Sequence, residues 1–174
     1  MTSPLLVGQA VNPTVNDRVT ENSDGRLGIG GIDWLLPKGW EIRAPSGSMR
    51  AGELVLPDHG VVAIFRFANG GGSAESNLER WQSQFSRHDT SWSTVDRSVG
   101  FPIHLTWIEG DLQTDRGPHG GMPPSENSQH KVLVGALLLA PKGLVVFKFL
   151  GSVAEARAML PSFRRMLTSV AQSP

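Results

Sequence analysis

The chain has 174 residues, of which 39% are hydrophobic and 18% charged, and this suits one domain with a buried core. Sixteen basic and sixteen acidic residues give a net charge of zero, so no global field favours nucleic acid or an anionic membrane as a partner. There is no cysteine, which excludes disulfides, thiolate nucleophiles and zinc-cysteine or iron-sulfur sites.

Residues 8–26 are polar and without apolar periodicity, and the start of the chain lacks the basic and apolar regions of an intact signal peptide. We expect residues 1–28 to form a flexible polar arm and residues 29–172 to form a single domain. No apolar run approaches the roughly 20 residues of a membrane span, so no transmembrane segment is expected. Two locations remain open: the cytoplasm if Met1 is the natural start, and an exported or periplasmic location if a signal was removed.

Apolar alternation begins near Ile32 and predicts several short strands. Residues 32–45 pair two short extended pieces around a Pro-Lys-Gly turn. Residues 48–57 and 61–68 predict a hairpin, because two apolar runs flank the turn sequence Pro-Asp-His-Gly.

A glycine-rich stretch then leads into a predicted helix over residues 74–87. The three glycines 70–72 suggest a phosphate site, but the spacing matches neither a Walker loop nor a dinucleotide fingerprint. We therefore interpret the glycines as a chain reversal and Ser73 as the N-cap of the helix. One apolar stripe marks the buried face of this helix, with residues at i, i+4, i+7 and i+11: Ala74, Leu78, Trp81 and Phe85.

The second half of the chain continues with strands and ends in a helix. Residues 91–99 and 101–110 alternate as strands, and residues 131–140 and 143–151 form a second apolar pair. Ser152 with Glu155 three positions later is a capping-box pattern that opens the last helix, and Pro161 should kink or restart that helix. The order of elements predicts an α+β fold with a mostly antiparallel sheet flanked by helices.

Three segments resemble bacterial members of the PsbP and Mog-type superfamily: LPKGWEIRAPSGSMRAGELVLP, GGGSAESNLERWQSQF and the C-terminal strand-Gly-helix element. The resemblance covers roughly residues 33 to 170 and includes PsbP-like or DcrB-like small domain proteins. It implies an α/β/α sandwich around an antiparallel sheet. It does not imply a reaction, because members of the superfamily include photosystem accessory subunits, a Ran-binding protein and small bacterial lipoproteins. The lipid-bearing cysteine of a lipoprotein is missing here, so no lipid anchor is expected.

Polar residues Asn77, Arg80 and Gln84 lie on one flank of the first predicted helix. Arginine with amide side chains can grip a carboxylate or a partner's backbone. The structural alternative is that Asn77 hydrogen-bonds the preceding turn and Arg80 bridges to a neighbouring loop.

The segment 113–129 is rich in glycine and proline and longer than most connections in compact domains. It is either a disordered connector or a recognition element, in which His119 and Met122 are the candidate contacts.

No catalytic or metal-binding arrangement is evident in the sequence. The five histidines lack the spacing of a helical or strand metal site, and no serine lies in a nucleophile-elbow pattern. No cofactor is therefore expected. The sequence favours a non-enzymatic accessory or binding module that holds a protein partner, with the oligomeric state open. The alternative is a small-ligand carrier or small enzyme with a site assembled from distant residues: Arg50, Arg66, His104 and Asp111.

Overall fold

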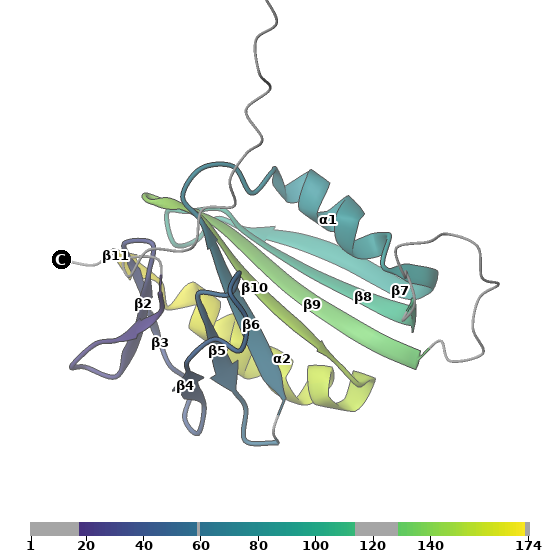
Figure 1. The fold of residues 1–174 in the computed structure, drawn as a ribbon, viewed down its shortest axis with the longest axis horizontal. Coiled ribbons are helices and arrows are strands. Elements are labelled where there is room, and N and C mark those ends of the chain that lie inside the picture. Colours follow the sequence, from purple (N-terminus) through teal and green to yellow (C-terminus); the bar gives the residue numbers. More distant parts are fainter. Residues whose placement is uncertain (1–17, 59, 114–128, 173–174) are drawn as a thin grey trace, which may run out of the picture.

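The computed structural model describes residues 18–58, 60–113 and 129–172. The strands are β1 (Thr20–Glu21), β2 (Arg26–Ile29), β3 (Ile32–Leu35), β4 (Glu41–Arg43), β5 (Gly52–Val55), β6 (Val61–Phe67), β7 (Phe85–Asp96), β8 (Ile103–Leu112), β9 (Gln129–Ala140), β10 (Gly143–Gly151) and β11 (Ala171–Gln172). The helices are α1 (Ala74–Gln82) and α2 (Val153–Thr168). The described strands form a seven-stranded sheet, β4-β5-β6-β10-β9-β8-β7, and a four-stranded sheet, β1-β2-β3-β11. Every strand pair is antiparallel, which confirms the predicted α+β architecture (Figure 1).

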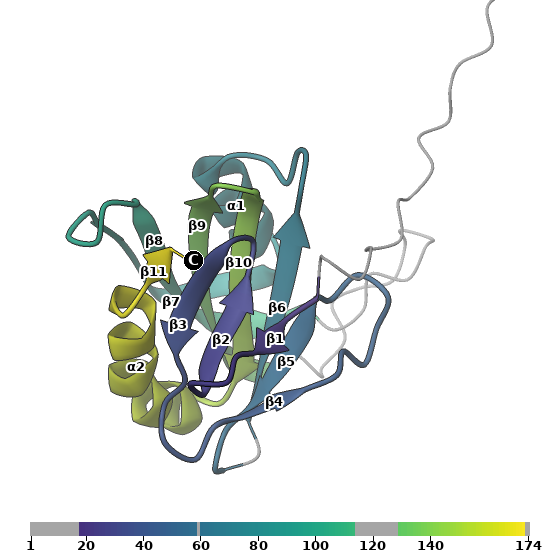
Figure 2. The same cartoon turned by 90° about the vertical axis from the view of Figure 1, so that its left-hand side faces the viewer.

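The seven-stranded sheet is covered differently on its two faces. Helix α2 and the small sheet pack on one face, as Figure 2 shows, while α1 lies on the other (Figure 1). On the α2 side, Phe147 of β10 contacts both layers, with its ring centroid 5.3 Å from that of Trp34 and 6.1 Å from that of Phe163. Both layers therefore share one apolar core with the main sheet. On the α1 side, Trp81 and Phe85 belong to a second, smaller hydrophobic cluster.

The turn before α1 depends on glycine. Gly70, Gly71 and Gly72 have φ values of 89°, 85° and 78°, a region that other residues rarely adopt. The chain thereby reverses from β6 into the helix, where the Ser73 hydroxyl accepts a hydrogen bond from the Ser76 amide at 3.1 Å. The interpretation of this stretch as a turn followed by an N-cap is confirmed.

Helix α1 ends earlier than its apolar periodicity predicts. Ser83 forms the C-cap, and Phe85 is the first residue of β7, paired with Leu112. Phe85 keeps its place beside Trp81 in the α1-side cluster although it is not helical. The stripe therefore identified Trp81 and Phe85 correctly as buried, whereas Ala74 and Leu78 are only partly buried. Pairing with β8 decided the secondary structure of Phe85.

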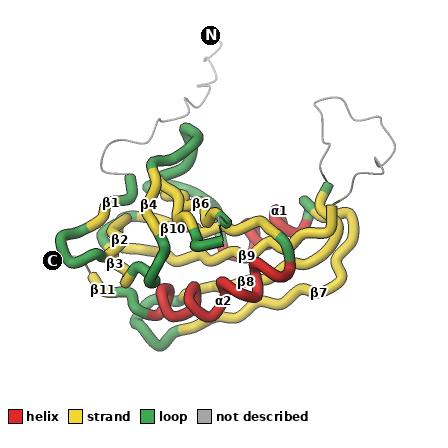
Figure 3. Tube along the Cα trace, turned by 90° about the horizontal axis from the view of Figure 1, so that it is seen from below, coloured by secondary structure: helices red, strands yellow, loops and turns green. Residues whose placement is uncertain are grey.

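Helix α2 begins at the predicted capping box. The Glu155 carboxylate accepts a hydrogen bond from the Ser152 amide at 2.7 Å, and the Ser152 hydroxyl accepts one from the Glu155 amide at 3.2 Å. The helix is continuous through Pro161, so the predicted restart at this residue is wrong. Figure 3 views the molecule from the side of α2.

One boundary and one strand pairing drawn from the sequence need correction. Strand β1 lies inside the range 1–28 expected to be an arm, strand β2 begins inside it, and Leu27 is fully buried. These strands were missed because they are short and are defined by pairing, β1 with β2 and β2 with β3, rather than by an apolar pattern of their own. Strands β3 and β4 do flank the Pro-Lys-Gly turn, but they belong to different sheets and do not pair with each other. No helix in the described ranges is long and apolar enough to cross a bilayer.

Candidate functional site

One row of residues crosses the main sheet on the side of α1. The row follows from the strand register, in which Arg43 on β4 pairs with Glu53 on β5, Glu53 with Ala63 on β6, Ala63 with Lys148 on β10, and Lys148 with Gly135 on β9. Residues paired directly across antiparallel strands project from the same face of the sheet. The sheet thus presents charged side chains from β4, β5 and β10 on one surface.

Helix α1 covers only part of this row. A Cβ atom on Gly135 would lie 2.1 Å from the Trp81 ring, so the indole of α1 occupies the space above Gly135. Next to it in the row, Lys148 is only partly buried. On β6, Val62 and Ile64 face α2 and are fully buried, whereas Phe65, on the α1 side, is half-buried. The α1-side surface of β4, β5, β6 and β10 is therefore less covered than the opposite one, and we call it the open face.

Glu53 is a fully buried carboxylate held by three side chains. Its Oε2 accepts a hydrogen bond from Arg43 Nε at 2.9 Å, and its Oε1 accepts bonds from the Ser46 hydroxyl and from Arg50. Burial alone would raise the pKa of this carboxyl, but the hydrogen bonds from Ser46, Arg43 and Arg50 outweigh burial and lower the pKa from 4.5 to about 2. Glu53 is thus ionised at neutral pH and fixes two arginines at the edge of the open face.

Lys148 has a different environment. Its ammonium group donates a hydrogen bond to the neutral Gln84 amide oxygen at 3.1 Å. Burial lowers the pKa of Lys148, and the nearby cations Arg80 and Arg50 lower it further. Among the described residues, neither Lys148 nor Arg80 forms an ion pair. The open face therefore carries cations that no carboxylate of the described chain neutralises.

The three residues predicted on the α1 flank have separate roles in the structure. Asn77 is buried, and its amide nitrogen donates to the carbonyls of Gly71 at 2.7 Å and Ser73 at 2.9 Å. These bonds match the structural alternative given above, in which Asn77 hydrogen-bonds the turn that precedes α1. Arg80 donates to the Asn77 amide oxygen rather than to a neighbouring loop, and Gln84 contacts Lys148. Arg80 and Gln84 thus lie at the border of the open face.

We define the basic strip as Arg43, Arg50, Arg80 and Lys148. Beyond Arg50, a shallow hollow of about 290 Å³ is lined by Arg18, Pro45, Ser46, Gly47, Ser48 and Arg50. Next to it, the Met49 side chain is 72% exposed. Sequence inspection could not assemble this strip, because its members come from β4, the 44–51 loop, α1 and β10.

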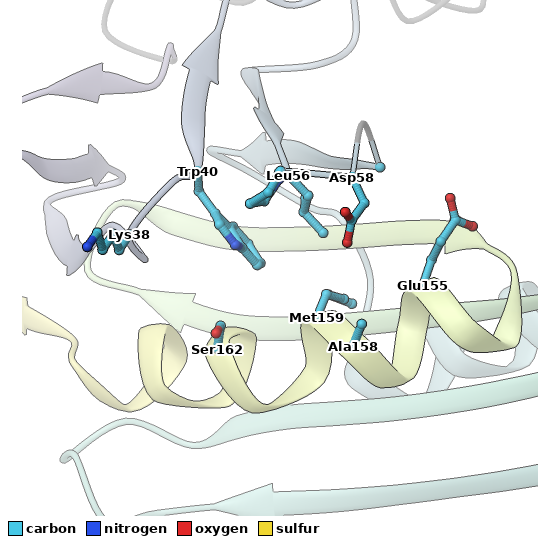
Figure 4. Close-up of a pocket in the computed structure, with 10 residues that line it drawn as sticks. Lys38, Trp40, Leu56, Asp58, Glu155, Ala158, Met159 and Ser162 are labelled. Carbon is cyan, nitrogen blue, oxygen red and sulfur yellow. The ribbon is translucent and has the colours of Figure 1, made fainter.

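A second hollow, of about 170 Å³, lies on the other side of the molecule, next to α2. Trp40, Leu56 and Met159 line its apolar part, while Lys38 lies toward one end and Glu155 toward the other (Figure 4). The Glu155 carboxylate already serves the capping box. The hollow next to α2 is smaller than the roughly 300–1,000 Å³ of pockets that enclose small-molecule ligands, and the hollow beside Arg50 is shallow and only reaches the lower end of that range.

The distant residues considered for a catalytic or ligand site do not converge. Arg50 binds Glu53, while Arg66 donates to the Lys142 carbonyl and Asp111 contacts Arg87. His104 lies on β8, near Glu75 of α1. Within the described ranges, no serine hydroxyl is hydrogen-bonded to a histidine, and no three acidic or histidine side chains are arranged to hold a metal ion. His119 and Met122 lie outside the described residues.

One cluster of ionisable residues was missed by sequence inspection. His130 on β9 lies 3.4 Å from Glu109 and 3.4 Å from Asp111 on β8, and 3.5 Å from Asp89 on β7. A hydrogen bond with Glu109, together with the neighbouring Asp111 and Asp89, raises the pKa of His130. The pairing of β8 with β9 creates the cluster, and no local spacing signals it.

Comparison with solved structures shows a PsbP-like fold. The chain is similar to cyanobacterial PsbP (CyanoP) from Synechocystis, with a TM-score of 0.52, 10% identity, and coverage of 95% of this chain and 98% of that one. It is also similar to LpqN, a protein involved in cell envelope biogenesis of Mycobacterium tuberculosis, with a TM-score of 0.51, 10% identity, and coverage of 82% and 83%. No protein-family model matches the chain, and no curated protein matches it significantly. At this identity the likeness shows the fold alone.

Proposed function

We propose that this protein is a non-catalytic accessory module that holds a protein partner on the open face, between helix α1 and the 44–51 loop. The observation that carries the proposal is the basic strip, in which cations from separate parts of the chain are displayed on one sheet surface. We also propose that the protein is a member of the PsbP and Mog-type superfamily, as its sequence motifs imply.

The geometry supports a binding surface better than a ligand carrier. A carrier needs an enclosed pocket with converging polar groups. The two hollows are small, and the titratable residues considered for an enclosed site lie apart. A sheet surface with charged and half-buried apolar side chains suits contact with another protein instead.

The proposal is tested by cross-linking pull-down from the native cell extract. The wild type is compared with an Arg80→Gln/Gln84→Ala double variant, which removes contacts from the open face and leaves Asn77 in place to brace the turn. Arg157→Gln is the matched control, because Arg157 is an exposed arginine elsewhere, on α2. We expect one protein to be recovered by the wild type and the control and lost with the double variant.

A second pull-down arm addresses the segment that contains His119 and Met122. A variant lacking residues 115–128 tests the predicted contribution of this segment to partner binding. Thermal unfolding of each variant shows whether the fold is retained. If every folded variant recovers the same proteins as the wild type, the open face does not hold the partner and the proposal fails.

A further inference from the structure

The basic strip has more cations than its own carboxylate can pair. Arg43 and Arg50 share the single carboxylate of Glu53. Arg80 and Lys148 donate instead to the neutral amide oxygens of Asn77 and Gln84, whose side chains carry no charge. A carboxylate accepts stronger hydrogen bonds from a cation than a neutral amide does. Among the residues that the structure describes, no carboxylate therefore pairs with Arg80 or Lys148.

We infer that the partner contacts the open face through an acidic protein segment, whose carboxylates bind Arg80 and Lys148. This inference rests on the proposed function and specifies the chemistry of the partner. The Arg80 guanidinium can bind a carboxylate with two parallel hydrogen bonds, which also fixes its orientation. The Lys148 ammonium can turn from Gln84 to an incoming anion, because an ammonium group has three rotatable donors.

Partial burial makes Lys148 a strong candidate for this contact. The side chain is only partly exposed, and Ala63, its neighbour in the row, is too short to reach the ammonium group. An interaction between opposite charges is stronger where water is partly excluded than at a fully hydrated surface. An acidic segment lying across β6 and β10 would exclude more water and strengthen its own ion pairs.

Several features favour a protein segment over nucleic acid. The chain has no net charge, so it lacks the long-range field that draws proteins to a phosphate backbone. Glu53 already pairs with Arg43 and Arg50, so a continuous polyanion would find fewer unneutralised cations along the strip. Half-buried Phe65 and exposed Met49 offer apolar contacts beside Lys148 and Arg50. A segment of mixed acidic and apolar residues complements this surface.

Fluorescence anisotropy with defined peptides tests the inference directly. The probe is a short labelled peptide of alternating glutamate and leucine, and the matched control peptide has glutamine in place of glutamate. We expect the acidic peptide to bind the wild type and the glutamine peptide to bind at least about tenfold more weakly. Affinity for the acidic peptide should fall as salt rises from about 50 mM to about 300 mM, because salt screens exposed charges.

Variants identify where the peptide binds. Arg80→Gln and Lys148→Gln should each weaken binding of the acidic peptide by about tenfold, the effect of losing one charged hydrogen bond. Arg157→Gln on α2 carries the same charge change and should bind like the wild type. Equal binding of the two peptides, or wild-type binding by both open-face variants while they remain folded, would overturn the inference.

Competition separates the inference from its alternatives. If a single-stranded oligothymidine displaces the acidic peptide as well as unlabelled peptide does, the strip is a general polyanion site and the inference is wrong. If the acidic peptide fails to bind while the pull-down partner is still lost with Arg80→Gln/Gln84→Ala, the open face holds a partner of other chemistry. Failure of both experiments would remove the inference and the proposed function together.

Discussion

Replacing Glu53 with glutamine should destabilise the protein, because this carboxylate anchors one end of the basic strip. The glutamine side chain would keep the volume of the glutamate but remove the charge that Arg43 and Arg50 share. Breaking a buried ion pair typically costs about 3–5 kcal/mol. The two arginine side chains are 52% and 37% exposed, so water can rehydrate them after the change. We therefore expect a loss of about 2 kcal/mol in the free energy of unfolding at neutral pH.

The pKa of Glu53 gives an independent route to the same quantity. The shift from 4.5 to about 2 corresponds to an upper limit of about 3 kcal/mol at about 1.4 kcal/mol per pKa unit. Solvent screening around the exposed arginines reduces this limit to about 2 kcal/mol. A carboxyl with a lowered folded pKa stabilises the fold above its unfolded pKa and loses that contribution as the pH falls through the folded value. The contribution of Glu53 is complete above about pH 5 and disappears between about pH 4.5 and 2.

Urea unfolding of the wild type and Glu53→Gln at about pH 7 and about pH 3 measures both effects. The difference in free energy of unfolding at the lower pH should be less than half of that at neutral pH. Glu41→Gln is the matched control, since Glu41 is an exposed glutamate on β4, and it should change stability by less than about 0.5 kcal/mol. An equal loss for Glu53→Gln at both pH values would refute the electrostatic reasoning and assign the loss to packing.

Three further predictions concern other parts of the fold. His130→Gln should lower the free energy of unfolding at about pH 5.5 but not at about pH 9. A histidine with a raised folded pKa stabilises the fold below its unfolded pKa of 6.5 and loses this effect as the pH rises through the folded value. A pKa of His130 at or below 6.5 by NMR titration would contradict this prediction. Gly135→Ala should cost about 1–3 kcal/mol in urea unfolding, because its Cβ would overlap the Trp81 ring, whereas Gly47→Ala, with open space around it, should be nearly neutral. Ser152→Ala should cost about 1 kcal/mol by the same assay through loss of the capping box, and an unchanged midpoint would show that α2 does not need this cap.

The sequence predicted the parts of the fold that local patterns encode. The β5–β6 hairpin follows from apolar runs flanking a turn, and the α2 capping box follows from two residues three positions apart. The glycine turn and Ser73 cap were likewise identified correctly, since backbone conformation and side-chain capping act within a few residues. The assignment of Phe85 was wrong because a helical stripe and a buried strand position are equally apolar, and only the pairing with Leu112 distinguishes them.

The open face could not be predicted in the same way. Lys148 and Ala63 are opposite each other only because β10 pairs with β6, and the sequence separation between them carries no local signal. The flank of α1 indicated Arg80 and Gln84, but the same pattern included Asn77, which is buried under the turn. Periodicity shows that residues share a helical flank, whereas exposure depends on what the rest of the chain packs beside that flank.

Lys148 is the residue whose contribution to fold stability and whose proposed role in binding differ most clearly. It is a charged residue in an otherwise apolar strand, on the same face as Leu144 and Val146, both of which are buried in the α1-side cluster. Burial and two nearby cations disfavour its charge, and its hydrogen-bond partner is a neutral amide. An apolar side chain at this position could extend the cluster beneath α1 and avoid the desolvation penalty. Positions where a sequence departs from the local rules of its fold are those where function is expected, and an acidic partner would convert the unfavourable charge of Lys148 into binding energy.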